Sequence, residues 1–199
     1  MSRKIGMISL GCPKNQVDAE LMLKKLVDAG YVLVQDADKA DIVIVNTCGF
    51  IDPAKQESID ACLEMAEYKN SGNCKALIVT GCLAERYRQE IIDEIPEVDA
   101  VLGTTSFDHI CEAVEEALGG KHLTKFDDLQ KLVKTETNRI LTTGGHYAHL
   151  KIAEGCDKHC TYCIIPKIRG TFRSVPMEQL VEEAKVLVSQ GVKELILVA

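Results

Sequence analysis

Six of the nine cysteines in this chain fall into two sets of three, and their type and spacing suit metal chemistry. The second set, Cys156, Cys160 and Cys163, has the spacing C-x3-C-x2-C within eight residues. Thiolates are the protein ligands of iron–sulfur clusters. Three of them would bind three irons of a 4Fe-4S cluster and leave the fourth iron open to a small chelating molecule.

Tetrahedral zinc is the main alternative for this second set, because thiolates bind zinc as well. A structural zinc needs a fourth ligand, and such sites usually show paired C-x-x-C motifs. His159 is one candidate, but it lies next to Cys160, so reaching the same ion would be strained, and we expect a solvated loop residue. An electron-carrying ferredoxin would need four cysteines for each cluster. The spacing therefore favours a cluster with one open iron.

The first set, Cys12, Cys48 and Cys82, has long gaps but one shared placement. Each cysteine follows the end of a predicted strand by one or two residues and precedes a helix start. In a parallel sheet of order 2-1-3-4-5 these strands are neighbours about 4.8 Å apart, so the thiols would emerge together. Helix starts also favour a thiolate. From spacing alone, a cluster site and three ordinary buried cysteines both remain open.

The three other cysteines are expected to have no role in metal binding. Cys111 lies on the apolar stripe of one predicted helix and Cys62 within another that is rich in apolar neighbours, and both are interpreted as small core residues. Cys74 is interpreted as an incidental loop thiol.

Five short apolar runs, several of them β-branched, are typical of buried parallel strands, and helix-length segments separate most of them. The expected strands are residues 3–10, 31–35, 41–46, 76–80 and 98–102. The expected helices are residues 15–29, 84–94, 107–118 with Ser106 as cap, and one that starts at the N-cap Asp52 followed by Pro53. Residues 1–120 are therefore predicted to form an α/β domain, an open doubly wound parallel sheet of the Rossmann or flavodoxin kind.

The rest of the chain predicts a linker and the start of a second domain. Residues 121–146 are polar and weakly periodic and are interpreted as a linker or hairpin. Residues 147–153 alternate as a strand, 176–190 read as a helix and 194–198 as another strand, which together make one βαβ unit in 147–199. One such unit cannot complete a sheet or barrel, so we expect the chain to be the front part of a longer protein.

Composition limits the classes of protein that the chain can represent. It has 199 residues, 46% of them apolar, and a net charge of −7, which is globular composition. The charge is −10 over residues 1–120 and +3 over 121–199, so the acidic part is a poor general nucleic-acid surface. No apolar run has the roughly 18 residues that span a bilayer, and no signal peptide is evident, so we expect a cytoplasmic protein without a disulfide framework.

Four motifs together resemble the radical S-adenosylmethionine methylthiotransferase family over the whole chain. They are Gly11-Cys-Pro-Lys-Asn, Asn46-Thr-Cys-Gly, Thr80-Gly-Cys and the stretch from Cys156 to Gly170, Cys-Asp-Lys-His-Cys-Thr-Tyr-Cys-Ile-Ile-Pro-Lys-Ile-Arg-Gly. Gly-Cys-Pro-Lys-Asn looks most like the branch that modifies an aspartate of ribosomal protein S-twelve. The branches that act on a tRNA adenosine beside the anticodon more often carry Gly-Cys-Gln-Met-Asn there.

The resemblance implies two 4Fe-4S clusters and S-adenosylmethionine as cofactors. The cluster on Cys156, Cys160 and Cys163 would bind S-adenosylmethionine and generate a radical at the start of a partial (β/α) barrel, of the TIM type. The cluster on Cys12, Cys48 and Cys82 would hold or supply the sulfur. Tyr162 fills the aromatic position of the motif and would meet the adenine through its backbone. An electron donor such as flavodoxin or ferredoxin is the implied partner.

No residue is assigned as a catalytic acid or base. Asp18 and Glu20 are expected to belong to the first turns of a helix, and Arg169 and Arg173 to support loop or backbone contacts. The family continues through the rest of the barrel into a small β-barrel domain called TRAM, so residues 1–199 alone are expected to give no turnover.

Three functions therefore compete at the level of sequence. The first is a methylthiotransferase acting on the aspartate β-carbon of ribosomal protein S-twelve, which the acidic amino-terminal domain favours because that partner is basic. The second is the same chemistry on tRNA, and the third is a non-catalytic module that binds metal or carries sulfur.

Overall fold

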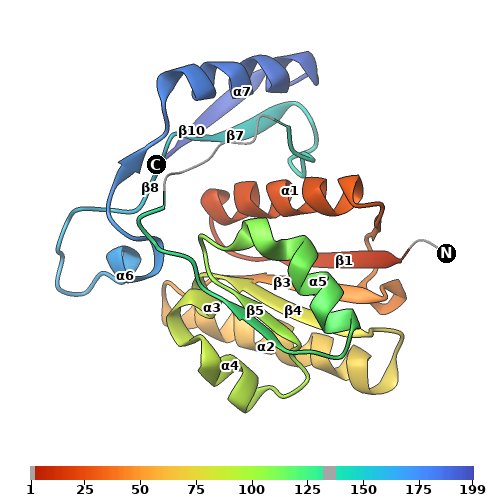
Figure 1. Cartoon of the computed structure of the whole chain (residues 1–199). Helices are drawn as coiled ribbons and strands as arrows, with labels where there is room; N and C mark the ends of the chain where they lie inside the picture. Colours follow the sequence, from red (N-terminus) through yellow and green to blue (C-terminus); the bar gives the residue numbers. More distant parts are fainter. Residues whose placement is uncertain (1–2, 132–137) are drawn as a thin grey trace.

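The structure, a computed structural model, describes residues 3–131 and 138–199 and contains one large parallel sheet (Figure 1). The strands lie in the order β2-β1-β3-β4-β5-β6 and every neighbouring pair is parallel. They are β1 (Lys4–Ser9), β2 (Val32–Val34), β3 (Ile42–Thr47), β4 (Ala76–Gly81), β5 (Ala100–Leu102) and β6 (Leu123–Lys125). The predicted α/β fold class and the order of the first five strands are confirmed.

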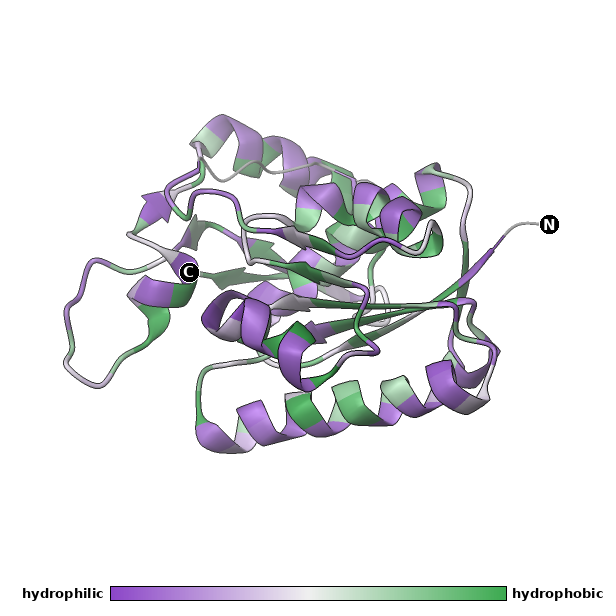
Figure 2. Ribbon diagram, turned by 60° about the horizontal axis from the view of Figure 1, so that its bottom comes forward, coloured by the Kyte–Doolittle hydropathy of each residue, from purple (hydrophilic) through white to green (hydrophobic). Residues whose placement is uncertain are grey.

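Both faces of the sheet are covered by helices, as continuous apolar strands require. In β3, Ile42 and Ile44 point into one core, while Val43 and Val45 point into the other. The first core is closed by α1 (Pro13–Asp28) and α5 (Ile110–Leu118), the second by α2 (Asp52–Ser71), α3 (Cys82–Tyr87) and α4 (Gln89–Glu94). Figure 2 shows the hydrophobic strands between helices in which hydrophobic and hydrophilic residues alternate.

Several predicted helix boundaries are wrong. The helix predicted over 84–94 is divided into α3 and α4 at Arg88, whose φ is +48°. Ile51, and not Asp52, is the N-cap of α2, so Asp52 is its first helical residue. Ser106 does not cap the helix that follows, because its hydroxyl accepts a bond from the backbone of Asp127 at 2.7 Å, and 107–109 form a 3-10 turn, η2 (Phe107–His109). A second 3-10 turn is η1 (Ala37–Lys39).

Part of the expected linker forms the sixth strand. Leu123–Lys125, within 121–146, pairs in parallel with β5 at the edge of the sheet. Three residues are too few for strand alternation to be visible in sequence, and backbone bonds to β5 hold this strand. Residues 132–137 of the expected linker lie outside the described residues, and the domain boundaries at 120 and 147 stay predictions.

The remaining elements include the expected βαβ unit, which lies beside α1 in Figure 1. β7 (Tyr147–Lys151) and β10 (Glu194–Val198) pair in parallel, and α7 (Met177–Ser189) connects them. Leu187 of α7 packs on Ala148 and Leu150 of β7. The antiparallel pair β8 (Ala153–Glu154) and β9 (Arg173–Ser174), and α6 (Ile165–Arg169) between them, were not predicted from the sequence.

In the described segments, 3–131 and 138–199, no helix combines the length needed to cross a bilayer with a sufficiently apolar composition.

Two glycines with similar positive φ angles differ in how closely their surroundings are packed. Gly81 precedes Cys82 at φ +94°, and a Cβ there would lie 2.5 Å from the carbonyl oxygen of Thr47. Gly30 has φ +91° with nothing within 4 Å of its Cβ position. We expect Gly30→Ala to cost about 1–2 kcal/mol of unfolding free energy from φ alone. Gly81→Ala should cost about 1–3 kcal/mol more, because the backbone must move. Urea unfolding measures both, and equal losses would contradict the prediction.

Candidate functional site

The three cysteines of the first set lie at the carboxyl ends of adjacent strands. Cys12 is the N-cap of α1, Cys48 follows β3, and Cys82 is the first residue of α3 after β4. The backbone between β1 and α1 lies against Cys48, since a Cβ on Gly11 would lie 3.2 Å from its Sγ. Cys82 is buried, Cys48 is half-buried and Cys12 is exposed. The predicted convergence of the three strand ends is therefore present.

Amide and hydroxyl side chains fix the loops that carry these cysteines. Asn15 in the first turn of α1 donates to the carbonyl oxygens of Leu10 and Thr47, both at 2.9 Å. Ser58 of α2 accepts a bond from the Cys48 backbone N–H at 2.9 Å and donates to the Cys48 carbonyl at 3.0 Å. Because buried backbone groups need partners, these side chains specify the course of the turns around Cys12 and Cys48.

The second set lies in a loop between β8 and α6. The loop is closed at its base, where the Cys156 N–H donates to the Gly170 carbonyl at 3.0 Å. Gly155, at φ +77°, allows this close approach, because a Cβ there would lie 2.0 Å from the Thr171 carbonyl oxygen. Cys160 accepts a backbone bond from Cys163 at 3.0 Å through its carbonyl and is exposed. The short β8–β9 pair thus presents the three cysteines on a tethered loop.

One cavity of about 620 Å³ joins the two sets. Its lining includes all three cysteines of the first set and, from the second, Cys156 and Cys163. Cys160 and Tyr162 are not among the lining residues, and Tyr162 is 90% exposed. The adenine contact expected of Tyr162 stays a prediction.

The cysteines have the ligand type that iron–sulfur groups take, and five of the six border one cavity. Within residues 3–131 and 138–199, no three His, Cys, Asp or Glu side chains are close enough together to hold a metal ion. Five thiols nevertheless border one cavity, and thiolates are the ligands that such clusters take. Metal ligation by the six cysteines therefore remains a prediction.

The other three cysteines lie away from this cavity. Burial raises the pKa of Cys62 to about 12, and burial likewise raises the pKa of Cys74 and Cys111. They are therefore thiols at neutral pH, and Cys62 and Cys111 pack against the cores as expected. Cys74 lies in the loop before β4, as expected, but it is buried there and donates to the Ala76 carbonyl at 3.2 Å.

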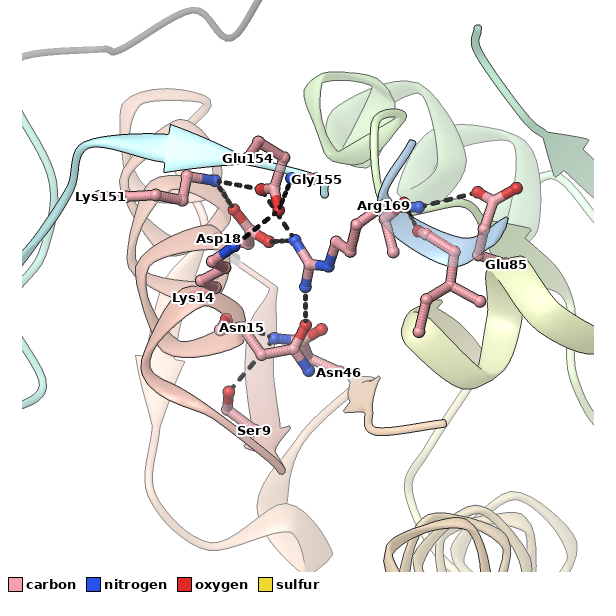
Figure 3. A network of polar contacts seen from close by, with 12 residues as sticks. Ser9, Lys14, Asn15, Asp18, Asn46, Glu85, Lys151, Glu154, Gly155 and Arg169 are labelled. Atoms are coloured by element: carbon pink, nitrogen blue, oxygen red, sulfur yellow. Dashed lines mark hydrogen bonds and ion pairs between the residues drawn. The ribbon is translucent and has the colours of Figure 1, made fainter. Parts of the chain in front are cut away.

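A buried network of charges connects the two halves of the site (Figure 3). Arg169 of α6 donates to Asp18 at 2.7 Å and to Glu154 at 3.1 Å through Nη1, and to Asn15 at 2.7 Å through Nη2. Lys151 of β7 bonds to Asp18 and lies 3.3 Å from Glu154. The side chains of all four charged residues are at most 7% exposed. Asp18 lies in the helix as expected, but its place in this network was not predicted from the sequence, and neither were the places of Lys151 and Glu154.

The charge of Arg169 also acts on Cys82 of the first cysteine set. Burial lowers the pKa of Arg169, but the charges of Cys82, Glu154 and Asp18 outweigh burial and hold that pKa well above its usual value. Burial raises the pKa of the Cys82 thiol, while Arg169 acts in the opposite direction through its charge and a hydrogen bond. Arg169 also borders the shared cavity. It does more than support the loop, whereas Arg173 bonds the Thr171 and Arg169 carbonyls, as expected.

Two further contacts attach residues 138–199, called the second segment below, to the sheet domain. Arg139 donates to Glu20 of α1 at 2.8 Å and also bonds Glu183 of α7. The Thr104 hydroxyl donates to the Ile168 carbonyl of α6 at 2.7 Å. The cysteine loop is therefore attached to the sheet domain through both α1 and the turn after β5.

Comparison with known families defines the class of the protein. Residues 150–199 match the model of the radical SAM superfamily, which is the part that holds the second cysteine set. Residues 4–103 match the model of the uncharacterized protein family UPF0004, which is the part that holds the first. The chain belongs to this UPF0004 family.

Three individual relatives show which branch of the family the chain resembles. The chain is 63% identical over 98% of its length to a protein of Lachnoclostridium phytofermentans, and 53% identical over 98% to one of Clostridium botulinum. It is 51% identical over 100% to one of Acetivibrio thermocellus. All three are named ribosomal protein uS12 methylthiotransferase RimO. The chain spans 44–45% of the length of these relatives. The predicted resemblance to radical S-adenosylmethionine methylthiotransferases, in particular to the RimO branch, is confirmed.

Arg139 provides a test of how strongly the second segment is attached. Arg139→Met leaves Glu20 and Glu183 buried without their cation and should cost about 3–5 kcal/mol of unfolding free energy. Lys24→Met, which removes the more exposed i,i+4 pair with Asp28 on α1, should cost less than about 1 kcal/mol. Urea unfolding measures both variants. Comparable losses of unfolding free energy in the two variants would show that the buried contacts of Arg139 do not attach the second segment.

Proposed function

We propose that this chain contributes both cluster sites to a radical S-adenosylmethionine methylthiotransferase. Its substrate is the β-carbon of an aspartate in uS12, the ribosomal protein S-twelve. The observation that supports this most directly is the cavity shared by Cys12, Cys48 and Cys82 with Cys156 and Cys163. Transfer of a sulfur-containing group to a carbon that has lost hydrogen requires both events at one place. The names of the relatives support the same reaction.

Each of the two cysteine sets would hold one cluster. Cys156, Cys160 and Cys163 would hold the 4Fe-4S cluster that takes S-adenosylmethionine at its open iron, and Cys12, Cys48 and Cys82 would hold a second 4Fe-4S cluster. When bound, these cofactors supply the radical and the sulfur that no side chain can provide. Tyr162 would meet the adenine through its backbone.

Apolar residues in the rest of the lining would limit the access of water, and charged residues orient the loops. Phe50, Ile165 and Ile168 give the cavity an apolar side, which would help to protect reactive species from solvent. The buried bonds of Arg169 to Asp18 and Glu154 hold α6, and with it the end of the second cysteine loop, next to the start of α1.

The charge distribution supports a protein substrate over RNA. Residues 1–120 carry 21 acidic against 11 basic side chains, which attracts a basic ribosomal protein and repels phosphate. A reduced flavodoxin or ferredoxin would supply the electron, and the cytoplasm is the location in which these partners occur together.

Iron analysis tests the two cysteine sets. The full-length protein, purified anaerobically, should contain about eight irons per chain, and changing Cys12, Cys48 and Cys82 to alanine should remove about half of them. The same change at Cys156, Cys160 and Cys163 should remove the other half. The matched control changes Cys62, Cys74 and Cys111, three cysteines away from the cavity, and should retain all the iron. Zinc in place of iron, or full iron in either test variant, would rule out the assignment.

The substrate is tested in a strain that lacks the full-length gene. We expect mass spectrometry to show loss of the methylthio group from an aspartate of uS12, with the methylthio groups of tRNA unchanged. The full-length gene should restore it, and a gene with Cys156→Ala should not. Loss from tRNA with intact uS12 modification would transfer the assignment to the tRNA branch.

A further inference from the structure

We propose that Lys14 binds the carboxylate of the substrate aspartate and thereby contributes to the substrate specificity of the cavity between the two cysteine sets. This inference rests on the proposed function, in which the substrate is an aspartate of uS12. Lys14 is in a position to contact the substrate, because it lines the cavity of about 620 Å³ that both cysteine sets border. The negative charge next to the reacting carbon would then be recognised by a residue of α1.

The side chains that line this cavity favour an anion. Within residues 3–131 and 138–199 the lining includes two basic residues, Lys14 and Arg169, and no acidic one. A carboxylate that enters such a cavity gives up water, and it needs a cation or several hydrogen-bond donors in exchange. Which of the two basic residues is free to serve as that partner depends on the contacts that each one already makes.

Arg169 is already paired within the protein. Its Nη1 donates to Asp18 at 2.7 Å and to Glu154 at 3.1 Å. Lys151 also bonds Asp18 and lies 3.3 Å from Glu154. These two cations face two anions, so this part of the network is neutral without Lys14.

Lys14 supplies a cation that the network does not need. Its ammonium nitrogen lies 3.6 Å from Glu154, beyond hydrogen-bond distance, and it makes no hydrogen bond in the part of the chain that the structure describes (Figure 3). An ammonium group has three donors. The side chain is 15% exposed, so a carboxylate in the cavity would meet it in a largely desolvated setting.

Helix stability does not explain the position of Lys14. It is the second residue of α1, close to the positive end of the helix dipole, where acidic side chains stabilise a helix and basic ones do not. The first turn, residues 13–16, contains no acidic side chain. A residue that opposes the local preference is typical of a functional position.

A bound carboxylate would also place the atom that reacts. In aspartate the β-carbon is bonded directly to the carboxyl carbon, so fixing the carboxylate fixes the β-carbon as well. S-adenosylmethionine carries a carboxylate too, but in the proposed function it is taken by the open iron of the second cluster. Lys14 lies two residues after Cys12 of the first set. The carboxylate expected at Lys14 is therefore that of the substrate.

The test measures binding in the full-length protein that carries both clusters. The probes are uS12 with aspartate at the position that is modified and uS12 with asparagine there, which removes the charge and keeps the size. Dissociation constants for both probes are measured anaerobically, without S-adenosylmethionine, in wild type, Lys14→Met, Lys14→Arg and Lys24→Met. Lys24→Met is the matched control, because it removes the same charge from the same helix at a residue that does not line the cavity.

The proposal predicts a charge preference that depends on Lys14. Wild type should bind the aspartate probe at least about tenfold more tightly than the asparagine probe, because hydrogen bonds between charged groups are strong when they are desolvated. Lys14→Met should bring this ratio to about one by weakening only the binding of the aspartate probe. Lys14→Arg should keep most of the ratio, and Lys24→Met should keep all of it.

Several outcomes overturn the proposal. A ratio near one in wild type does so, and so does a ratio that Lys14→Met leaves unchanged. Weaker binding of S-adenosylmethionine by Lys14→Met, with the ratio intact, would assign Lys14 to that carboxylate instead. If Lys14→Met does not fold or loses iron, Lys14→Gln takes its place, and the same loss in both means that Lys14 only supports the first cluster.

Failure of the proposed function gives a different result. In that case uS12 keeps its methylthio group in the strain that lacks the full-length gene, whatever the binding ratios are. Loss of the group from uS12 in that strain, together with a ratio that does not depend on Lys14, rejects this inference alone.

Discussion

The ion pair between Asp18 and Arg169 joins two segments that are 151 positions apart, and the arrangement of the site depends on it. Asp18 lies in the helix that begins after Cys12, and Arg169 ends the helix that follows the second cysteine loop. Holding these two helices together therefore sets the separation between the two cysteine sets. Glu20, two residues further along α1, bonds Arg139 and so attaches the second segment at another point.

Burying so many charges is not an efficient way to stabilise a protein, because desolvation offsets much of the attraction. An apolar contact of the same size would hold the segments at least as firmly, but it would tolerate small shifts of one helix along another. Charge-assisted bonds to Asp18, Glu154 and Asn15 have fixed lengths and directions. We interpret the network as a device for precise placement, at a site where thiols from five separate chain positions must border one cavity.

The sequence predicted those features that depend on local signals. Apolar runs with β-branched residues located the five main strands, and the placement of Cys12, Cys48 and Cys82 after three of them indicated their convergence. It did not predict β6, whose three residues pair only through the backbone, or the break at Arg88, where a single φ angle is unusual. It also missed Lys151 and Glu154, because a charged residue in a strand pattern gives no sign of a partner far away in the chain.

The order in which the chain is made gives the long separation of Asp18 and Arg169 a further meaning. Synthesis proceeds at roughly 5–20 residues per second, so the 151 positions correspond to on the order of ten seconds. In the last part of this interval, after Cys82 has been made, the nascent chain has all three thiols of the first set but not the arginine that borders the same cavity. The loop that carries the second cysteine set can therefore be held against α1 only after the chain has been made as far as Arg169.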